Sequence, residues 1–134
     1  MNVFRALKAD IESVIQQLVE AGKLPGDTNS SRVSVELPRD PSHGDLSTNA
    51  AMVLAKPAGL KPRDLAETVA EGLRALDFVE TVDVAGPGFI NLSLADQFWC
   101  QRLVDVLEAG TAYGNGDIPG NGAVNIEYVS ANPT

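Results

Sequence analysis

The feature that most constrains the fold is a pair of alternating segments on either side of the tripeptide Gly86-Pro87-Gly88. Apolar residues recur at every second position in both segments, at Val82, Val84, Ile90, Leu92 and Leu94. A period of two places apolar side chains on one face of a strand, and a Gly-Pro-Gly stretch between two such runs is typical of a tight turn. The pattern predicts antiparallel strands near 79–85 and 89–94 with one face toward a core.

The opposite face of the second strand carries Phe89, Asn91 and Ser93. A phenyl ring next to a carboxamide can receive an unstacked nucleic-acid base, because the base stacks on the ring and forms hydrogen bonds with the amide. The alternative is structural: Phe89 packs beneath a loop or helix, and Asn91 caps the turn. The alternation fixes the shared face and leaves both interpretations open.

Helical spacing of apolar residues predicts four helices along the chain. The first spans 3–20 and stops near Gly22, and the second spans 46–55, capped by Asp45 and ended by Pro57. A third begins at Pro62 and carries Leu65 to Leu76, and a fourth is capped by Asp96 and stopped by Gly110. With a further strand at 33–37, the chain predicts an α+β fold, a small antiparallel sheet with helices packed on one face.

The composition changes after residue 110, where GTAYGNGDIPGNG is rich in glycine. Such a stretch is typical of a linker. We therefore predict a domain over 1–110, a linker over 111–123, and the first strand and turn of a following domain over 124–134.

The net charge of −8 argues against a protein that binds nucleic acid mainly through an overall positive charge. Any RNA contact must then be local and assisted by other parts of a larger protein. The single cysteine, Cys100, excludes an intramolecular disulfide and suits a reducing cytosol. No run of ~18 apolar residues is present, so no membrane span is predicted.

Two other polar groups have both a functional and a structural interpretation. His43, the only histidine, cannot form a zinc site of usual ligand number without cysteines, and it has no paired nucleophile for hydrolytic catalysis. We therefore expect His43 and Asp45 to organise the turn and cap the helix. Lys56, Lys61 and Arg63 could contact a phosphate backbone or could be solvated loop charges.

The last residues, VNIEYVSANPT, predict a strand over 124–129 followed by a turn. Glu127, near the end of that strand, comes before Ser130 and Asn132 in the turn. Their oxygen acceptors could hold a guanidinium or ammonium group. A surface strand with an exposed glutamate is the structural alternative.

Three motifs together resemble the bacterial arginyl-tRNA synthetases, class I enzymes. HGDLSTNAAMVLAK and VAGPGFINLSL resemble the additional N-terminal domain of that family, and IEYVSANPT resembles the entry to its Rossmann-like catalytic domain. The resemblance covers residues 43–134, and the N-terminal helix fits by position and pattern. It implies the N-terminal part of a longer enzyme, truncated just before the ATP-binding signature.

The resemblance also implies roles for individual residues. Phe89 and Asn91 would read a base in the D-loop of tRNA(Arg), whereas Glu127 and Asn132, with Ser130 between them, would bind L-arginine. The parent would be a cytoplasmic, monomeric arginine–tRNA ligase that uses ATP and Mg²⁺. The truncated chain would bind neither ATP nor metal and would hold no catalytic residue. The alternative is a free-standing protein-interaction domain related to the synthetase domain.

Overall fold

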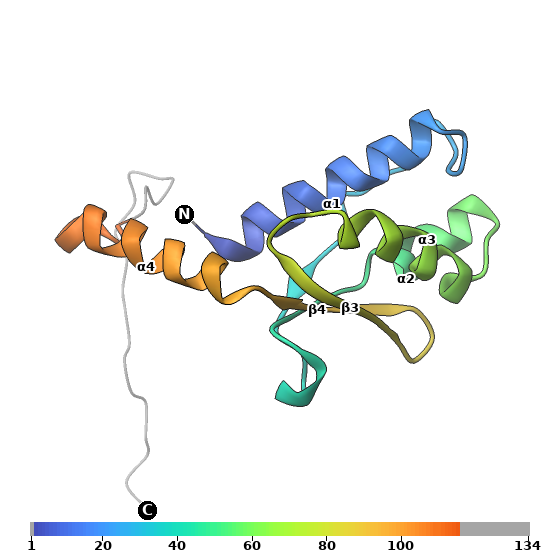
Figure 1. Ribbon diagram of the computed structural model, residues 1–134. Coiled ribbons are helices and arrows are strands. Elements are labelled where there is room, and N and C mark those ends of the chain that lie inside the picture. The colour runs from blue at the N-terminus through green and yellow to red at the C-terminus, as the bar shows by residue number, and fades with distance from the viewer. Residues whose placement is uncertain (1, 116–134) are drawn as a thin grey trace, which may run out of the picture.

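The computed structural model describes residues 2–115 and has the expected α+β architecture, shown in Figure 1. The helices are α1 (Val3–Glu20), α2 (Ala50–Ala58), α3 (Pro62–Arg74) and α4 (Asp96–Ala109), with short 3-10 turns η1 (Pro41–His43) and η2 (Gly110–Ala112). The strands are β1 (Val35–Glu36), β2 (Leu46–Thr48), β3 (Val79–Ala85) and β4 (Phe89–Leu94). Helices α1, α2 and α3 lie on one side of the sheet, and η1 lies on the other (Figure 1).

The sheet has four antiparallel strands in the order β1-β2-β4-β3. The hairpin predicted around Gly86-Pro87-Gly88 is confirmed, with Ala85 opposite Phe89 and Val84 opposite Ile90. The strand expected at 33–37 is shorter, Val35–Glu36, and it pairs with β2. The pairing of β2 with β4 widens the sheet surface on which the helices pack.

The start of the second helix was predicted wrongly, because residues 46–48 form β2 and the helix begins at Ala50. Leu46 and Thr48 alternate with Ser47 and are each about 1% exposed, so this short segment has the burial pattern of a strand. The expected stop at Pro57 was also wrong. Pro57 lies in the last turn, and α2 ends one residue later, where Gly59 adopts a left-handed conformation with φ of 68°.

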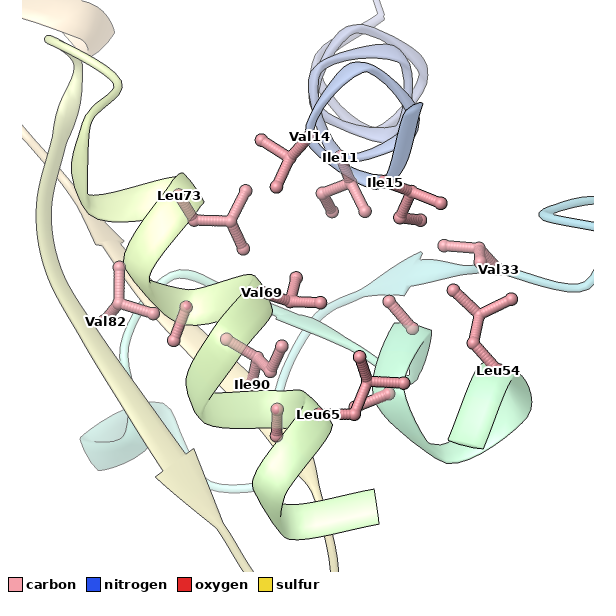
Figure 2. Close-up of a cluster of buried hydrophobic side chains, with 14 of the residues drawn as sticks. Ile11, Val14, Ile15, Val33, Leu54, Leu65, Val69, Leu73, Val82 and Ile90 are labelled. Carbon is pink, nitrogen blue, oxygen red and sulfur yellow. The ribbon is translucent and has the colours of Figure 1, made fainter. Parts of the chain in front are cut away.

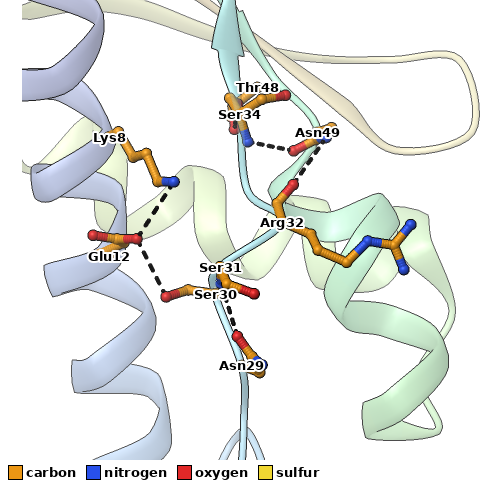
Figure 3. A network of polar contacts seen from close by, with 9 residues as sticks. All are labelled: Lys8, Glu12, Asn29, Ser30, Ser31, Arg32, Ser34, Thr48 and Asn49. Carbon is orange, nitrogen blue, oxygen red and sulfur yellow. Dashed lines mark hydrogen bonds and ion pairs between the residues drawn. The ribbon is translucent and has the colours of Figure 1, made fainter. Parts of the chain in front are cut away.

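Side-chain hydrogen bonds join the segment just before β1 to the end of β2 and the start of α2 (Figure 3). The Asn49 Oδ1 accepts a hydrogen bond from Ser34 N at 2.9 Å, and its Nδ2 donates to Arg32 O at 3.4 Å. Thr48 Oγ1 donates to Ser34 O at 2.8 Å. These bonds satisfy backbone groups that a two-residue edge strand would otherwise leave unpaired.

The core lies between the sheet and helices α1–α3, as Figure 2 shows. Ile11, Leu73 and Ile90 are completely buried there. Gly72 allows α1 and α3 to pack closely, because a Cβ atom at this position would lie 2.5 Å from Val14 Cγ1. The apolar residues that predicted helices α1 and α3 lie on the faces that are buried in this core.

Helix α4 projects away from the three packed helices (Figure 1). None of the side chains of α4 is buried. Its partly buried Phe98 and Trp99 are the only apolar side chains of this helix that pack against the core. The Phe98 ring lies 5.2 Å from the Phe78 ring and 5.4 Å from the Trp99 ring, centroid to centroid. Its bounds agree with the prediction, but Asp96 is the first helical residue, and the N-cap is Ala95 without a side-chain bond.

Within residues 2–115, no helix is long and apolar enough to cross a membrane. The predicted strand at 124–129 and most of the predicted linker lie outside the described residues.

Candidate nucleic-acid interface

The sheet face opposite the helices carries a row of polar side chains. In the strand register Glu36 pairs with Ser47, Ser47 with Asn91, and Asn91 with Asp83. Directly paired residues point to the same side of a sheet, so these four side chains share the face that the helices leave uncovered. The alternation of GFINLSL indicated this face only for β4, and the sheet register adds Ser47 from β2.

This face is hollowed into an open pocket of about 600 Å³. Ser47 and Asn91 line it from the sheet, Phe89 from the start of β4, and Pro38, Arg39 and His43 from the preceding loop. The volume lies in the range of sites that bind small molecules, roughly 300–1,000 Å³. The two residues singled out from the sequence, Phe89 and Asn91, therefore line one concave site.

Phe89 is 43% exposed, and the residue before it, Gly88, is buried. Its backbone is held by the hairpin turn, where Gly88 has φ of 146° and a Cβ would lie 3.0 Å from Pro62 O. Arg63 Nη1 donates a hydrogen bond to Gly86 O at 3.3 Å, which ties the turn to the start of α3. The ring is thus a solvent-accessible apolar surface on an anchored backbone.

Asn91 is recessed, with only 7% of its surface exposed. Its carboxamide forms no hydrogen bond with any of residues 2–115, so it does not cap the hairpin turn. The nitrogen and oxygen of this carboxamide are not fully shielded from solvent, so they remain accessible from the pocket. A buried amide without a partner costs stability, and such a group can be retained for a ligand.

The pocket wall opposite the strands is the loop around η1, which is fixed to β4 by Asp45. Asp45 N donates to Leu92 O at 2.8 Å, and the Asp45 carboxylate accepts from Leu94 N at 2.8 Å. The expected helix cap by Asp45 is therefore wrong, but its expected role in organising the turn is confirmed. Gly44 allows the close approach, with φ of 102° and a hypothetical Cβ 2.7 Å from Leu92 O.

Within the loop, Asp40 caps η1 by accepting a hydrogen bond from Ser42 N at 2.9 Å. Hydrogen bonds from Ser42 lower the pKa of Asp40, and the nearby His43 contributes a smaller effect in the same direction. The loop conformation is therefore set by local bonds as well as by Asp45. His43 is exposed and lines the pocket.

The other basic residues considered from the sequence do not line the pocket. Lys56 lies in the last turn of α2, Lys61 precedes α3, and Arg63 contacts the hairpin turn as described. No group of three or more His, Cys, Asp and Glu residues suited to a metal occurs within residues 2–115. Glu127, Ser130 and Asn132 lie outside the described residues.

Ser47 and Arg39 are among the pocket residues that were missed from the sequence. Ser47 was missed because residues 46–48 were assigned to a helix, and a segment of three residues is too short to show the period of a strand. Arg39 lies in a turn with no periodic pattern, so its position depends on how the loop folds back over β4.

Comparisons with known proteins place the chain in a family. The model of the arginyl tRNA synthetase N terminal domain matches residues 5–94. Over 134 residues the chain is 58% identical to an arginine–tRNA ligase of Parvibaculum lavamentivorans and 52% identical to one of Roseobacter denitrificans. Each alignment covers 100% of this chain and 23% of the relative, so the chain spans about a quarter of the length of these curated relatives.

The fold also occurs in a solved structure. The crystal structure of arginyl-tRNA synthetase from Plasmodium falciparum matches 72% of this chain and 16% of that protein, with a TM-score of 0.58 and 16% sequence identity. This comparison supports the arrangement of strands and helices, and the family match rests on the sequence. The chain belongs to the family of arginyl-tRNA synthetase N-terminal domains.

Proposed function

We propose that this chain is the N-terminal domain of an arginine–tRNA ligase and that it recognises an exposed base in the D-loop of tRNA(Arg). The observation that carries the proposal is the pairing of an exposed Phe89 ring with an unpartnered Asn91 carboxamide in one open pocket. The ring can stack with any base, and the recessed amide can select one by its hydrogen-bonding edge.

The charge of the chain sets the share of affinity that this site supplies. A chain with a net charge of −8 forms few phosphate contacts, so most of the binding affinity for tRNA would come from other parts of the parent enzyme. We therefore expect the isolated chain to bind tRNA weakly. Submicromolar, salt-sensitive binding of tRNA to the isolated chain in a filter assay would contradict this expectation.

The parent enzyme would attach L-arginine to tRNA(Arg) in the cytoplasm, as a monomer using ATP and Mg²⁺. Family membership supports this proposal, since the relatives are arginine–tRNA ligases. In the segment beyond the described residues, Glu127 and Asn132, with Ser130 between them, would hold the polar groups of arginine. The segment 111–123 would link the tRNA-binding domain 1–110 to the catalytic domain beginning at 124.

The test compares Phe89→Ala, Phe89→Tyr and Asn91→Ala in the full-length enzyme. Loss of the stacked ring or the amide should weaken tRNA binding by on the order of 1–3 kcal/mol, whereas Phe89→Tyr keeps a ring and should bind nearly normally. Arginine binding is the control and should be unchanged. If both alanine variants bind tRNA(Arg) like the wild type, the proposed site is wrong.

A second arm of the test identifies the ligand as a D-loop base. Transcripts of tRNA(Arg) with each exposed D-loop base replaced in turn should lose affinity for the wild type at one position. The same replacement should cost little more in Asn91→Ala, because the discriminating group is already absent. Equal losses in both enzymes would show that Asn91 reads no D-loop base.

A further inference from the structure

We propose that Arg39 binds the phosphate of the nucleotide whose base stacks on Phe89. This inference rests on the proposed D-loop site and assigns the backbone contact that the ring and amide do not provide. The ligand is a single nucleotide unit of an RNA loop, held by its base on the strand side and by its phosphate on the loop side.

The position of Arg39 supports a phosphate contact. Arg39 lines the same pocket as Phe89 and Asn91, but it comes from the η1 loop, whereas they come from β4. A nucleotide lying across the pocket would therefore meet an aromatic ring and amide from one element and a guanidinium from another. Arginine forms bidentate hydrogen bonds with phosphate oxygens, which fixes the orientation of the bound group.

The availability of the guanidinium gives a second argument. Arg39 is exposed and forms no ion pair or side-chain hydrogen bond with any of residues 2–115. By contrast, Arg63 is bonded to Gly86 O, and Arg74 is bonded to Val82 O and lies 3.9 Å from Glu67. Among the described residues that line the pocket, Arg39 is the only lysine or arginine.

The loop holds Arg39 near a fixed place. Asp40, the next residue, caps η1, and the far end of the loop is bonded to β4 through Asp45. Gly44 leaves no space for a Cβ against Leu92. A cation on an anchored loop loses less conformational entropy on binding than one on a free loop, so its contact contributes more affinity.

The charge pattern inside the pocket favours one orientation of the nucleotide. Glu36 also lines the pocket, and it pairs with Ser47 at the β1 side of the sheet. A phosphate placed beside Glu36 would be repelled, whereas one placed beside Arg39 is attracted. The chain as a whole carries a charge of −8, so this local cation is what makes the pocket acceptable to an RNA backbone.

The experiment uses the full-length enzyme with Arg39→Gln, Arg39→Lys and the matched control Arg5→Gln. Arg5 is an exposed arginine on α1, on the opposite side of the sheet, and its removal changes the net charge equally. The dissociation constant for tRNA(Arg) is measured at several salt concentrations. Arg39→Gln should weaken binding about tenfold at low salt and reduce the slope of log K against log salt by about 0.7–1.

Arg39→Lys should keep the salt slope but regain only part of the affinity, because lysine retains the charge without the bidentate geometry. Arg5→Gln should leave both affinity and slope unchanged. A slope in Arg39→Gln equal to that of the wild type would overturn the phosphate contact, as would an equal change in Arg5→Gln.

The two proposals fail in different ways. If Asn91→Ala and Phe89→Ala weaken tRNA binding while Arg39→Gln does not, the D-loop site stands and only the phosphate contact is wrong. If none of the three variants weakens binding, the pocket does not bind tRNA. Replacing the recognised base should cost the wild type and Arg39→Gln the same factor, since a phosphate contact carries no base information.

Discussion

Asp45 and Leu94 are 49 positions apart in the sequence, and the Asp45 carboxylate accepts a hydrogen bond from Leu94 N at 2.8 Å. This bond closes the η1 loop onto β4 and gives the pocket its second wall. The HGD sequence is thereby explained as a structural unit: His43 faces the pocket, Gly44 allows contact with the strand, and Asp45 makes the bond.

We expect Asp45→Ala to lower the free energy of unfolding by about 1–3 kcal/mol, because it leaves a partly buried N–H without a partner. Asp45→Asn keeps an acceptor oxygen and should cost less. Urea unfolding of the 134-residue chain measures both. If the two variants are equally stable, the hydrogen bond does not contribute in the way the structure indicates.

A second prediction concerns Asn91, whose recessed carboxamide has no partner within residues 2–115. Asn91→Val replaces it with a β-branched side chain suited to a strand, so the free energy of unfolding should rise by up to about 1 kcal/mol. The same change should weaken tRNA binding by the full-length enzyme. A variant that loses stability would show that the fold itself uses the amide.

The contact between Gly72 and Val14 gives a third prediction. Gly72→Ala gains helix propensity of about 1 kcal/mol, but the new Cβ would lie 2.5 Å from Val14 Cγ1, and overpacking costs about 1–3 kcal/mol. We therefore expect Gly72→Ala to destabilise the wild type but to stabilise Val14→Ala, in which the obstructing methyl groups are absent. Chemical denaturation of the four proteins gives the coupling energy. Additive effects would show that the helices move apart freely.

The fourth prediction concerns pH. Burial raises the pKa of Asp10, a residue in the middle of α1. The folded chain therefore binds this proton more tightly than the unfolded chain, and stability is lost as the pH rises through the folded pKa. Asp10→Asn removes that loss, so it should raise the melting temperature at pH 7 and leave it unchanged near pH 3. Glu71→Gln, at an exposed position on α3, is the control for net charge.

The sequence predicted the hairpin correctly because its two alternating runs and its turn are adjacent, so local pattern and final pairing agree. It did not predict β2, since Leu46–Thr48 is only three residues long and is followed directly by a helix. Such a segment becomes a strand because β1 and β4 flank it, and its pairing with β4 joins residues that are 42 to 46 positions apart in the sequence. Local propensity carries little information about it.

The candidate site was predicted to a similar extent. Alternation placed Phe89 and Asn91 on one face, and the structure brings both to the same pocket. Alternation could not show that Asn91 is recessed, because its burial depends on the path of the loop that carries Arg39. That path is set by the Asp45–Leu94 bond and the space at Gly44, which are tertiary features.

Helix α4 contacts the core only through Phe98 and Trp99, in its first turn, and it exposes Leu103 and Leu107 further along. A helix of 14 residues is marginal in water when it lacks tertiary support. Its final turns should therefore fray while the sheet stays folded, and their amide protons should exchange with solvent far sooner than those of β4. The cooperative folding unit of this chain would accordingly end near Trp99, well before the end of the helix.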